Sequence, residues 1–142
     1  MVAAALGGCG GGDDETTFPA GVSQSIGKVE FLAEADRICN STNVRIEAAA
    51  DDLGRRHPPP AQVRQVALSI AVPALQTEVR AIRALGAPRG DEQKVRAILA
   101  ATERGIAEIR ADPTAVVNGV PAGLREASRL ARAYGSQQCD VR

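Results

Sequence analysis

Three cysteines are the residues of this sequence whose chemistry is easiest to place: Cys9, Cys39 and Cys139, in a chain of 142 residues. A cysteine sulfur can carry a lipid, bind a metal ion or form a disulfide. Metal sites need several ligands that converge, and the chain has one histidine, His57, in a proline-rich loop. We therefore interpret His57 as a solvated loop residue and expect neither a metal ion nor a cofactor.

Motifs for covalent catalysis are missing from the sequence. It contains no Gly-x-Ser-x-Gly motif, and no free cysteine is expected near the histidine, so nucleophilic catalysis has no candidate residue. A pair of carboxylates for acid–base catalysis is an alternative that the sequence leaves open. The acidic residues considered for it fall where solvated helix faces are expected: Glu30, Glu34, Glu47, Asp51 and Asp52. We expect a protein that is not an enzyme.

The first cysteine closes the sequence Leu6-Gly7-Gly8-Cys9, and a stretch rich in glycine and acidic residues follows it. The order leucine, small, small, cysteine resembles the lipobox of bacterial lipoproteins, which implies that Cys9 carries lipid. A signal peptide needs a basic segment and about 7–15 apolar residues before such a box, but here only residues 1–6 precede it. We expect the true start to lie upstream of Met1, the alternative being an accidental match.

This resemblance divides the chain into three parts: a truncated signal peptide with the lipobox at 1–9, a flexible linker at 10–27 and a helical domain at 28–142. The linker is assigned from its glycine, serine and threonine content. No stretch reaches the roughly 18 apolar residues of a membrane-spanning helix. The domain is therefore expected to be anchored to the outer face of the cell membrane and not embedded in it.

Apolar residues recur at three- and four-residue steps over residues 28–53, 60–85, 91–110 and 121–134, which predicts four helices. Pro73 predicts a kink near 69–73 in the second helix, and Gly105 is expected to mark a close contact in the third. In the second helix the predicted buried residues are Val63, Val66, Ile70, Leu68, Val72, Leu75, Val79 and Ile82. The predicted fold is all-α, an antiparallel four-helix bundle with a kinked second helix.

Cys39 and Cys139 are predicted to form a disulfide from the first helix to the C-terminal tail. If Cys9 carries lipid, two cysteines remain, and thiols outside the cytoplasm tend to oxidise. In an up-down-up-down bundle the fourth helix ends beside the start of the first. Cys39 lies about 16 Å along the first helix at 1.5 Å per residue, and the five residues after Tyr134 reach about as far when extended. Two free buried thiols are the alternative.

The charges offer one candidate surface. The chain has 17 basic and 17 acidic residues, so no overall field favours nucleic acid. Arg125, Arg129 and Arg132 fall on one face of the fourth helix, with Glu126 the acid among them. They could contact anionic lipid headgroups or wall polymer, whereas a solvated face is the simpler interpretation.

The pattern F-x-x-x-A-x-x-I-C ending at Cys39, with Y-G-x-x-x-C ending at Cys139, resembles uncharacterised small lipoproteins of high-GC Gram-positive bacteria. In that group a lipobox and a spacer rich in glycine and acidic residues precede an alanine-rich helical domain with a cysteine near each end. The resemblance implies an extracytoplasmic lipoprotein of the cell envelope and no activity. We expect a non-enzymatic domain that binds an envelope protein or polymer. The alternative is a carrier of a small apolar ligand in the bundle core.

Overall fold

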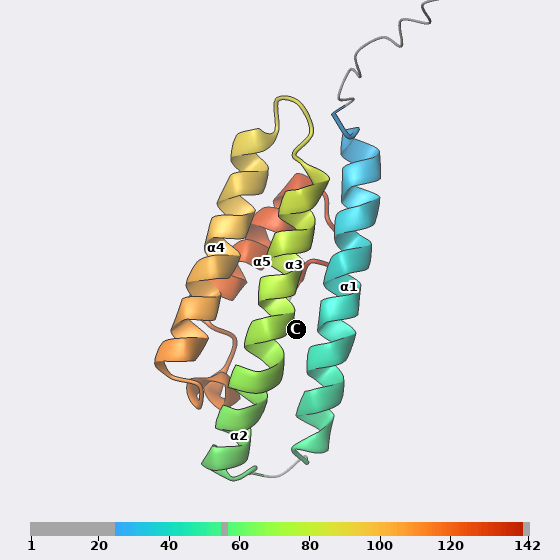
Figure 1. Ribbon diagram of the computed structural model, residues 1–142. Helices are drawn as coiled ribbons and strands as arrows, with labels where there is room; N and C mark the ends of the chain where they lie inside the picture. Colours follow the sequence, from blue (N-terminus) through green and yellow to red (C-terminus); the bar gives the residue numbers. More distant parts are fainter. Residues whose placement is uncertain (1–24, 55–56, 141–142) are drawn as a thin grey trace, which may run out of the picture.

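The computed structural model describes residues 25–54 and 57–140, which consist of helices and loops without a strand (Figure 1). The elements in chain order are α1 Lys28–Asp52, α2 Pro60–Val66, the π-helical segment η1 Ala67–Ala71, α3 Val72–Leu85, α4 Glu92–Ala111, the 3-10 turn η2 Ala115–Asn118 and α5 Ala122–Tyr134. Because α2, η1 and α3 are continuous, the described chain forms four long helices. The predicted all-α class is confirmed, and each long helix begins and ends within one residue of its predicted range.

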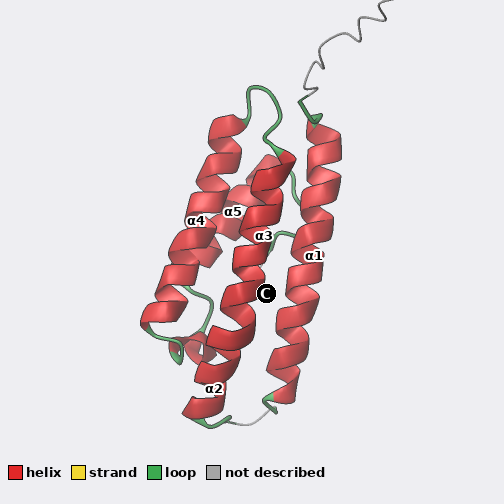
Figure 2. Cartoon of the chain, in the orientation of Figure 1, coloured by secondary structure: helices red, strands yellow, loops and turns green. Residues whose placement is uncertain are grey.

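The long helices pack as a bundle in which α3 occupies a central position. Figure 2 shows α1 and α4 on either side of α3, with α5 behind α3 and α4. Aromatic residues are scarce, so the core consists mostly of aliphatic side chains such as Val79, Leu99 and Ile106. Phe31 and Tyr134 pack edge to face near the start of α1, with ring centroids 6.2 Å apart. The predicted signal peptide and lipobox lie outside the described residues, as does most of the linker.

The π-helical segment changes which side chains of the second helix reach the core. Pro73 follows η1 and has no backbone N–H to donate to the helix ladder. A π turn holds an extra residue, so the register predicted for a regular α-helix shifts here. The prediction that Leu68 is buried is wrong, because its exposed fraction is 37%, whereas Ala67 is 3% exposed. Val63, Val72, Leu75, Val79 and Ile82 are buried as predicted.

Helices α4 and α5 approach each other through two glycines. A Cβ atom added to Gly123 would lie 2.3 Å from the backbone nitrogen of Gly105 and 2.8 Å from the carbonyl oxygen of Ala101. No side chain fits between the two backbones at this crossing. The N–H of Gly123 also donates to the carboxylate of Glu108, at 3.1 Å to the nearer oxygen. The expectation that Gly105 marks a close contact is confirmed, and its partner is Gly123.

Candidate functional site

The tail of the chain is covalently joined to the middle of α1. Cys39 and Cys139 form a disulfide with an S–S distance of 2.04 Å and a Cα–Cα distance of 5.0 Å. The predicted pairing of these two residues is therefore present in the structure. Cys39 is 1% exposed, and Cys139 is partly buried. The bond closes a loop of about 100 residues, so it links the C-terminal tail to the first helix of the described domain.

Polar groups on α1 hold the same tail on both sides of the disulfide. The carboxylate of Asp36 accepts hydrogen bonds from the backbone N–H groups of Gln137 and Gln138 and from the hydroxyl of Ser136. The amide of Asn43 donates to the carbonyl oxygens of Gln138, at 2.9 Å, and Asp140, at 3.3 Å. These hydrogen bonds and the disulfide together fix the tail on α1 at several points.

Asp36 and Asn43 were not identified by the sequence analysis. They lie three residues before and four residues after Cys39, which places all three side chains on one face of the helix. That spacing was the signal available in the sequence. Polar side chains that share a helix face with a buried cysteine need hydrogen-bond partners from another part of the chain. The tail itself turns back toward α1 at Gly135, whose φ of 121° is one that side chains rarely adopt.

A cavity of about 450 Å³ opens between α1, the second helix and the connection before α5. We call it the interhelix cavity. Its lining is largely aliphatic and includes Ile46, Ala50, Leu53, Val63, Val66, Ala67, Ala71, Ile109, Val116, Val117, Val120 and Leu124. Asn43 and Glu47 supply polar side chains to the lining, and Glu47 is its charged residue. The arrangement therefore offers a mostly apolar volume with a small polar region on α1.

Small side chains and the π-helical segment form one wall of the interhelix cavity. Ala67 and Ala71, the first and last residues of η1, both line it, and neither fills the space that a leucine would. The opposite wall is the connection 113–121, which contains η2. The carboxylate of Asp112 accepts hydrogen bonds from the N–H groups of Thr114 and Ala115 and so fixes the start of this connection.

The three arginines predicted to form a basic strip each have a partner within the domain. The guanidinium of Arg129 donates through Nε and Nη2 to Glu126, at 2.8 and 2.7 Å. Arg132 forms an ion pair with Asp140 at 2.9 Å, and Arg125 donates to the carbonyl oxygen of Val120. These contacts are intramolecular, so contact with an anionic surface through this strip stays a prediction.

Glu78 is a half-buried carboxylic acid next to the disulfide. It lines a small cavity of about 30 Å³ together with Cys39, Cys139, Thr102 and Ser128. Burial raises the pKa of Glu78 above its ordinary value of 4.5, and a hydrogen bond with Thr42 partly opposes that rise. The folded state therefore favours the protonated acid, since the charged form loses hydration on burial.

Replacing Glu78 by glutamine is expected to make folding less dependent on pH. Because the pKa of Glu78 is raised in the folded state, its contribution to stability is full below about 4.5 and is lost as the pH rises through the folded pKa. Glutamine does not ionise, so the stability of the E78Q variant does not fall in this way as the pH rises. Urea unfolding at pH 4 and pH 7 should show the variant gaining stability relative to the parent at the higher pH.

E30Q, on the exposed face of α1, is the control. If the free energies of unfolding of E78Q and the parent differed by the same amount at both pH values, the raised pKa of Glu78 would be contradicted.

The described residues contain no group of three or more histidine, cysteine, aspartate and glutamate side chains placed to hold a metal ion. His57 is exposed in the loop before α2, and its backbone has a φ of 45°. Within residues 25–54 and 57–140, none of the helices combines the length and the apolar content needed to cross a membrane. Cys9 lies outside the described residues.

Comparison of the chain with protein-family models, with curated proteins and with solved structures finds no match.

Proposed function

We propose that this protein is a lipid-anchored extracytoplasmic domain, without enzymatic activity, that carries a small apolar ligand in the interhelix cavity. The observation that carries the proposal is the cavity itself, at about 450 Å³. Binding sites for small molecules have volumes of about 300–1,000 Å³ and combine apolar walls with a few polar groups. The other expectation is binding of an envelope protein or polymer; the one candidate surface for it is the basic strip, whose arginines already have partners within the domain.

The lining also indicates the chemical class of the ligand. Aliphatic side chains from α1, α2 and the 113–121 connection favour a hydrocarbon chain or ring system. Glu47 is the charged lining residue, and an anionic ligand would be repelled by it. The amide of Asn43 is already used by the tail, which leaves its oxygen as an acceptor. These groups favour a neutral or cationic amphiphile, such as a long-chain alcohol or amine, over a fatty acid.

Replacing Ala50 by tryptophan is expected to block this binding. Ala50 is exposed and lines the cavity, so the indole would occupy the space of the ligand without entering the buried core. The fluorescence of N-phenyl-1-naphthylamine should rise on addition of the parent chain and fall when dodecanol displaces it. A50W should bind roughly tenfold less tightly, since excluding two methylene groups costs about 1.6 kcal/mol.

The matched control is A48W, which places the same side chain at an exposed position of α1 outside the cavity lining. It should bind the probe as the parent does. Two results would sink the proposal: no rise in fluorescence with the parent chain, or equal binding by the parent and A50W.

The proposed anchor rests on Cys9 and its resemblance to a lipobox cysteine. The disulfide supports the proposed location, because disulfides persist mainly in oxidising compartments. Globomycin blocks the cleavage that exposes a lipobox cysteine. In cells that express the gene with its upstream sequence, the drug should cause a slower-migrating precursor to accumulate, as should the C9A variant. Unchanged mobility of the protein in treated cells would show that Cys9 is not a processing site.

We extend the proposal to the arrangement of the helices as an antiparallel bundle with a bent second helix. The connections after α1 and after α3 are short, which favours antiparallel neighbours. A π-helical segment that ends two residues before Pro73 supports a bend, because both features are common causes of helix kinks. A bend at η1 would place α2 over the interhelix cavity, where Val63 and Val66 lie.

A further inference from the structure

A second hollow lies on the surface between α3 and α4 and has a different lining from the interhelix cavity. Its volume is about 350 Å³, and the buried side chains of Val79 and Ile106 form its floor. Arg80, Arg83 and Arg110 line it together with Gln76 and Glu103. Three guanidinium groups against one carboxylate make this hollow, which we call the arginine groove, net positive.

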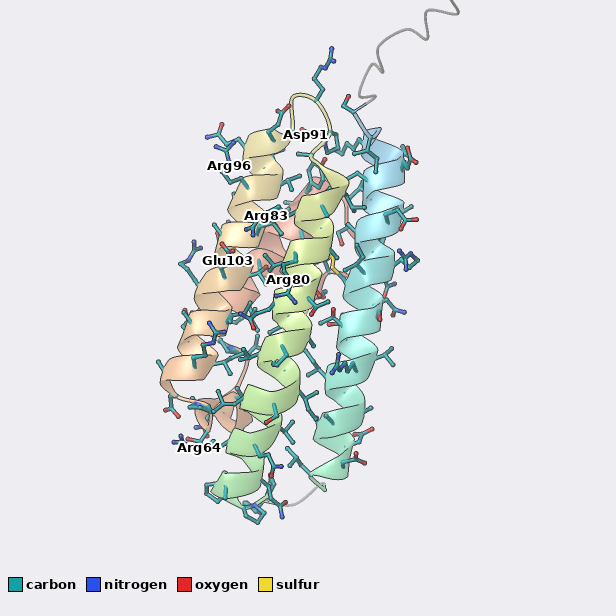
Figure 3. All side chains as sticks on the ribbon, in the orientation of Figure 1. Arg64, Arg80, Arg83, Asp91, Arg96 and Glu103 are labelled. Carbon is teal, nitrogen blue, oxygen red and sulfur yellow. A yellow bond between two sulfur atoms is a disulfide. The ribbon has the colours of Figure 1, made fainter. Side chains whose placement is uncertain are left out.

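A neighbouring hollow on the same face of the molecule also contains arginine, balanced there by two glutamates. Figure 3 shows Arg80 and Arg83 on α3 near Glu103 on α4, with Arg96 further along α4. Arg83 and Glu103 also border a neighbouring hollow of about 260 Å³, which Arg96 and Glu92 line as well. The Arg83–Glu103 ion pair therefore lies between two hollows that both carry arginine.

The guanidinium groups of the arginine groove retain donors for a ligand. The guanidinium group of Arg110, at the end of α4, takes part in none of the side-chain hydrogen bonds or ion pairs found among the described residues. Arg80 donates through Nη2 to the hydroxyl of Thr77 at 2.9 Å, which leaves most of its five N–H donors available. Arg83 pairs with Glu103 at 2.8 Å, but both side chains are more than half exposed. Such exposed pairs contribute little and exchange readily.

The contrast with α5 shows why the groove, and not the predicted strip, is the better anion site. Arg129 uses two of its nitrogens on Glu126, and Arg132 is paired with Asp140 beside the tail. Those two arginines lie on one helix surface, and neither lines any of the hollows described here. In the groove, arginines from two helices border one concave volume, which allows several of them to contact the same ligand.

We propose that the arginine groove binds a phosphate-type oxyanion, whether it is the phosphate of a lipid headgroup or a free phosphate. Guanidinium groups match the geometry of phosphate oxygens through paired N–H donors, which a single ammonium group cannot do. Arg80 and Arg110 contact the anion directly. Arg83 exchanges Glu103 for the ligand. Glu103 competes with the ligand for Arg83, so its charge weakens binding.

Binding is measured on the full oxidised chain with two probes. Inorganic pyrophosphate is titrated by calorimetry, and vesicles of phosphatidylglycerol or phosphatidylcholine are tested by co-sedimentation. Binding to pyrophosphate alone identifies a soluble phosphate as the ligand, and retention on phosphatidylglycerol vesicles identifies a lipid headgroup. In either case the affinity falls with added salt, because exposed charges are screened.

The variants separate the groove from general charge. R80Q/R110Q is expected to weaken binding roughly tenfold or more, since two charge-assisted hydrogen-bonding groups are removed. R37Q/R45Q changes the net charge equally on α1 and should bind as the parent does. E103Q should bind more tightly than the parent. Absence of binding to both probes overturns the proposal, as does an equal loss in R80Q/R110Q and R37Q/R45Q. Because no residue lines both sites, these outcomes are independent of ligand binding in the interhelix cavity.

Discussion

Loss of the Cys39–Cys139 disulfide is expected to lower the free energy of unfolding by about 4–5 kcal/mol. The bond closes a loop of about 100 residues, and the chain-entropy model assigns about 4.7 kcal/mol to a loop of that length. The effect is large for a domain of this size, because small proteins are stable by only about 5–15 kcal/mol. The core consists mostly of aliphatic side chains and alanine. It contains few large aromatic side chains, whose burial would otherwise add stability to the domain.

The measurement is urea unfolding of the C39S/C139S variant beside the oxidised parent. Replacing both cysteines avoids a free buried thiol and leaves the contacts of Asp36 and Asn43 with the tail in place. C9S is the control, since the proposed lipid-carrying residue takes no part in this bond, and it should unfold as the parent does. A difference below about 1 kcal/mol between C39S/C139S and the parent would show that the disulfide does not determine stability.

Replacing Gly123 by alanine is expected to destabilise the domain by about 1–3 kcal/mol, at the upper end of that range. The added methyl group would lie within 2.8 Å of backbone atoms of Gly105 and Ala101, which no rotamer change can relieve. Helices α4 and α5 would have to separate. Alanine favours a helix over glycine by about 1 kcal/mol, and this gain is smaller than the cost of moving two packed helices.

The control is A133L, which enlarges an exposed side chain on the same helix and should change stability by about 0.5 kcal/mol or less. Thermal unfolding followed by circular dichroism gives the comparison. Should G123A unfold at or above the melting temperature of the parent, the close crossing of α4 and α5 would not be a packing constraint in solution.

The long helices could be predicted from the sequence because their signals are local. Apolar residues repeat at helical spacing, and the predicted ends at residues 85 and 134 are each followed by a glycine that caps the helix, Gly86 and Gly135. The pairing of Cys39 with Cys139 could also be predicted, since few cysteines were available and the reach of the tail matched the distance along the first helix. These inferences needed only chain geometry.

The π-helical segment and the interhelix cavity could not be predicted in this way. The sequence near Pro73 indicated an irregularity, but the regular 3.6-residue period assigned Leu68 to the core in place of Ala67. The cavity depends on which helices face each other and on how far Ala67 and Ala71 lie from the 113–121 connection. Such distances are set by tertiary packing and have no local signal.

The partners of the arginines were likewise hidden in the sequence. Glu126 was visible three residues before Arg129, but the partner of Arg132 is Asp140 in the tail, whose position is set by tertiary contacts with α1. Arg80 and Arg110 come from different helices, and no spacing within one helix could place them around a common hollow. The contacts of these arginines therefore depend on how the helices and the tail pack together.

The claim that the domain carries an apolar ligand is tested most directly by native mass spectrometry of the protein isolated from its own envelope under mild conditions. The proposal predicts a mass above that of the processed polypeptide and its anchor, by one small neutral or cationic amphiphile, which organic extraction removes. A population consisting of processed polypeptide and anchor alone, both before and after extraction, would contradict it.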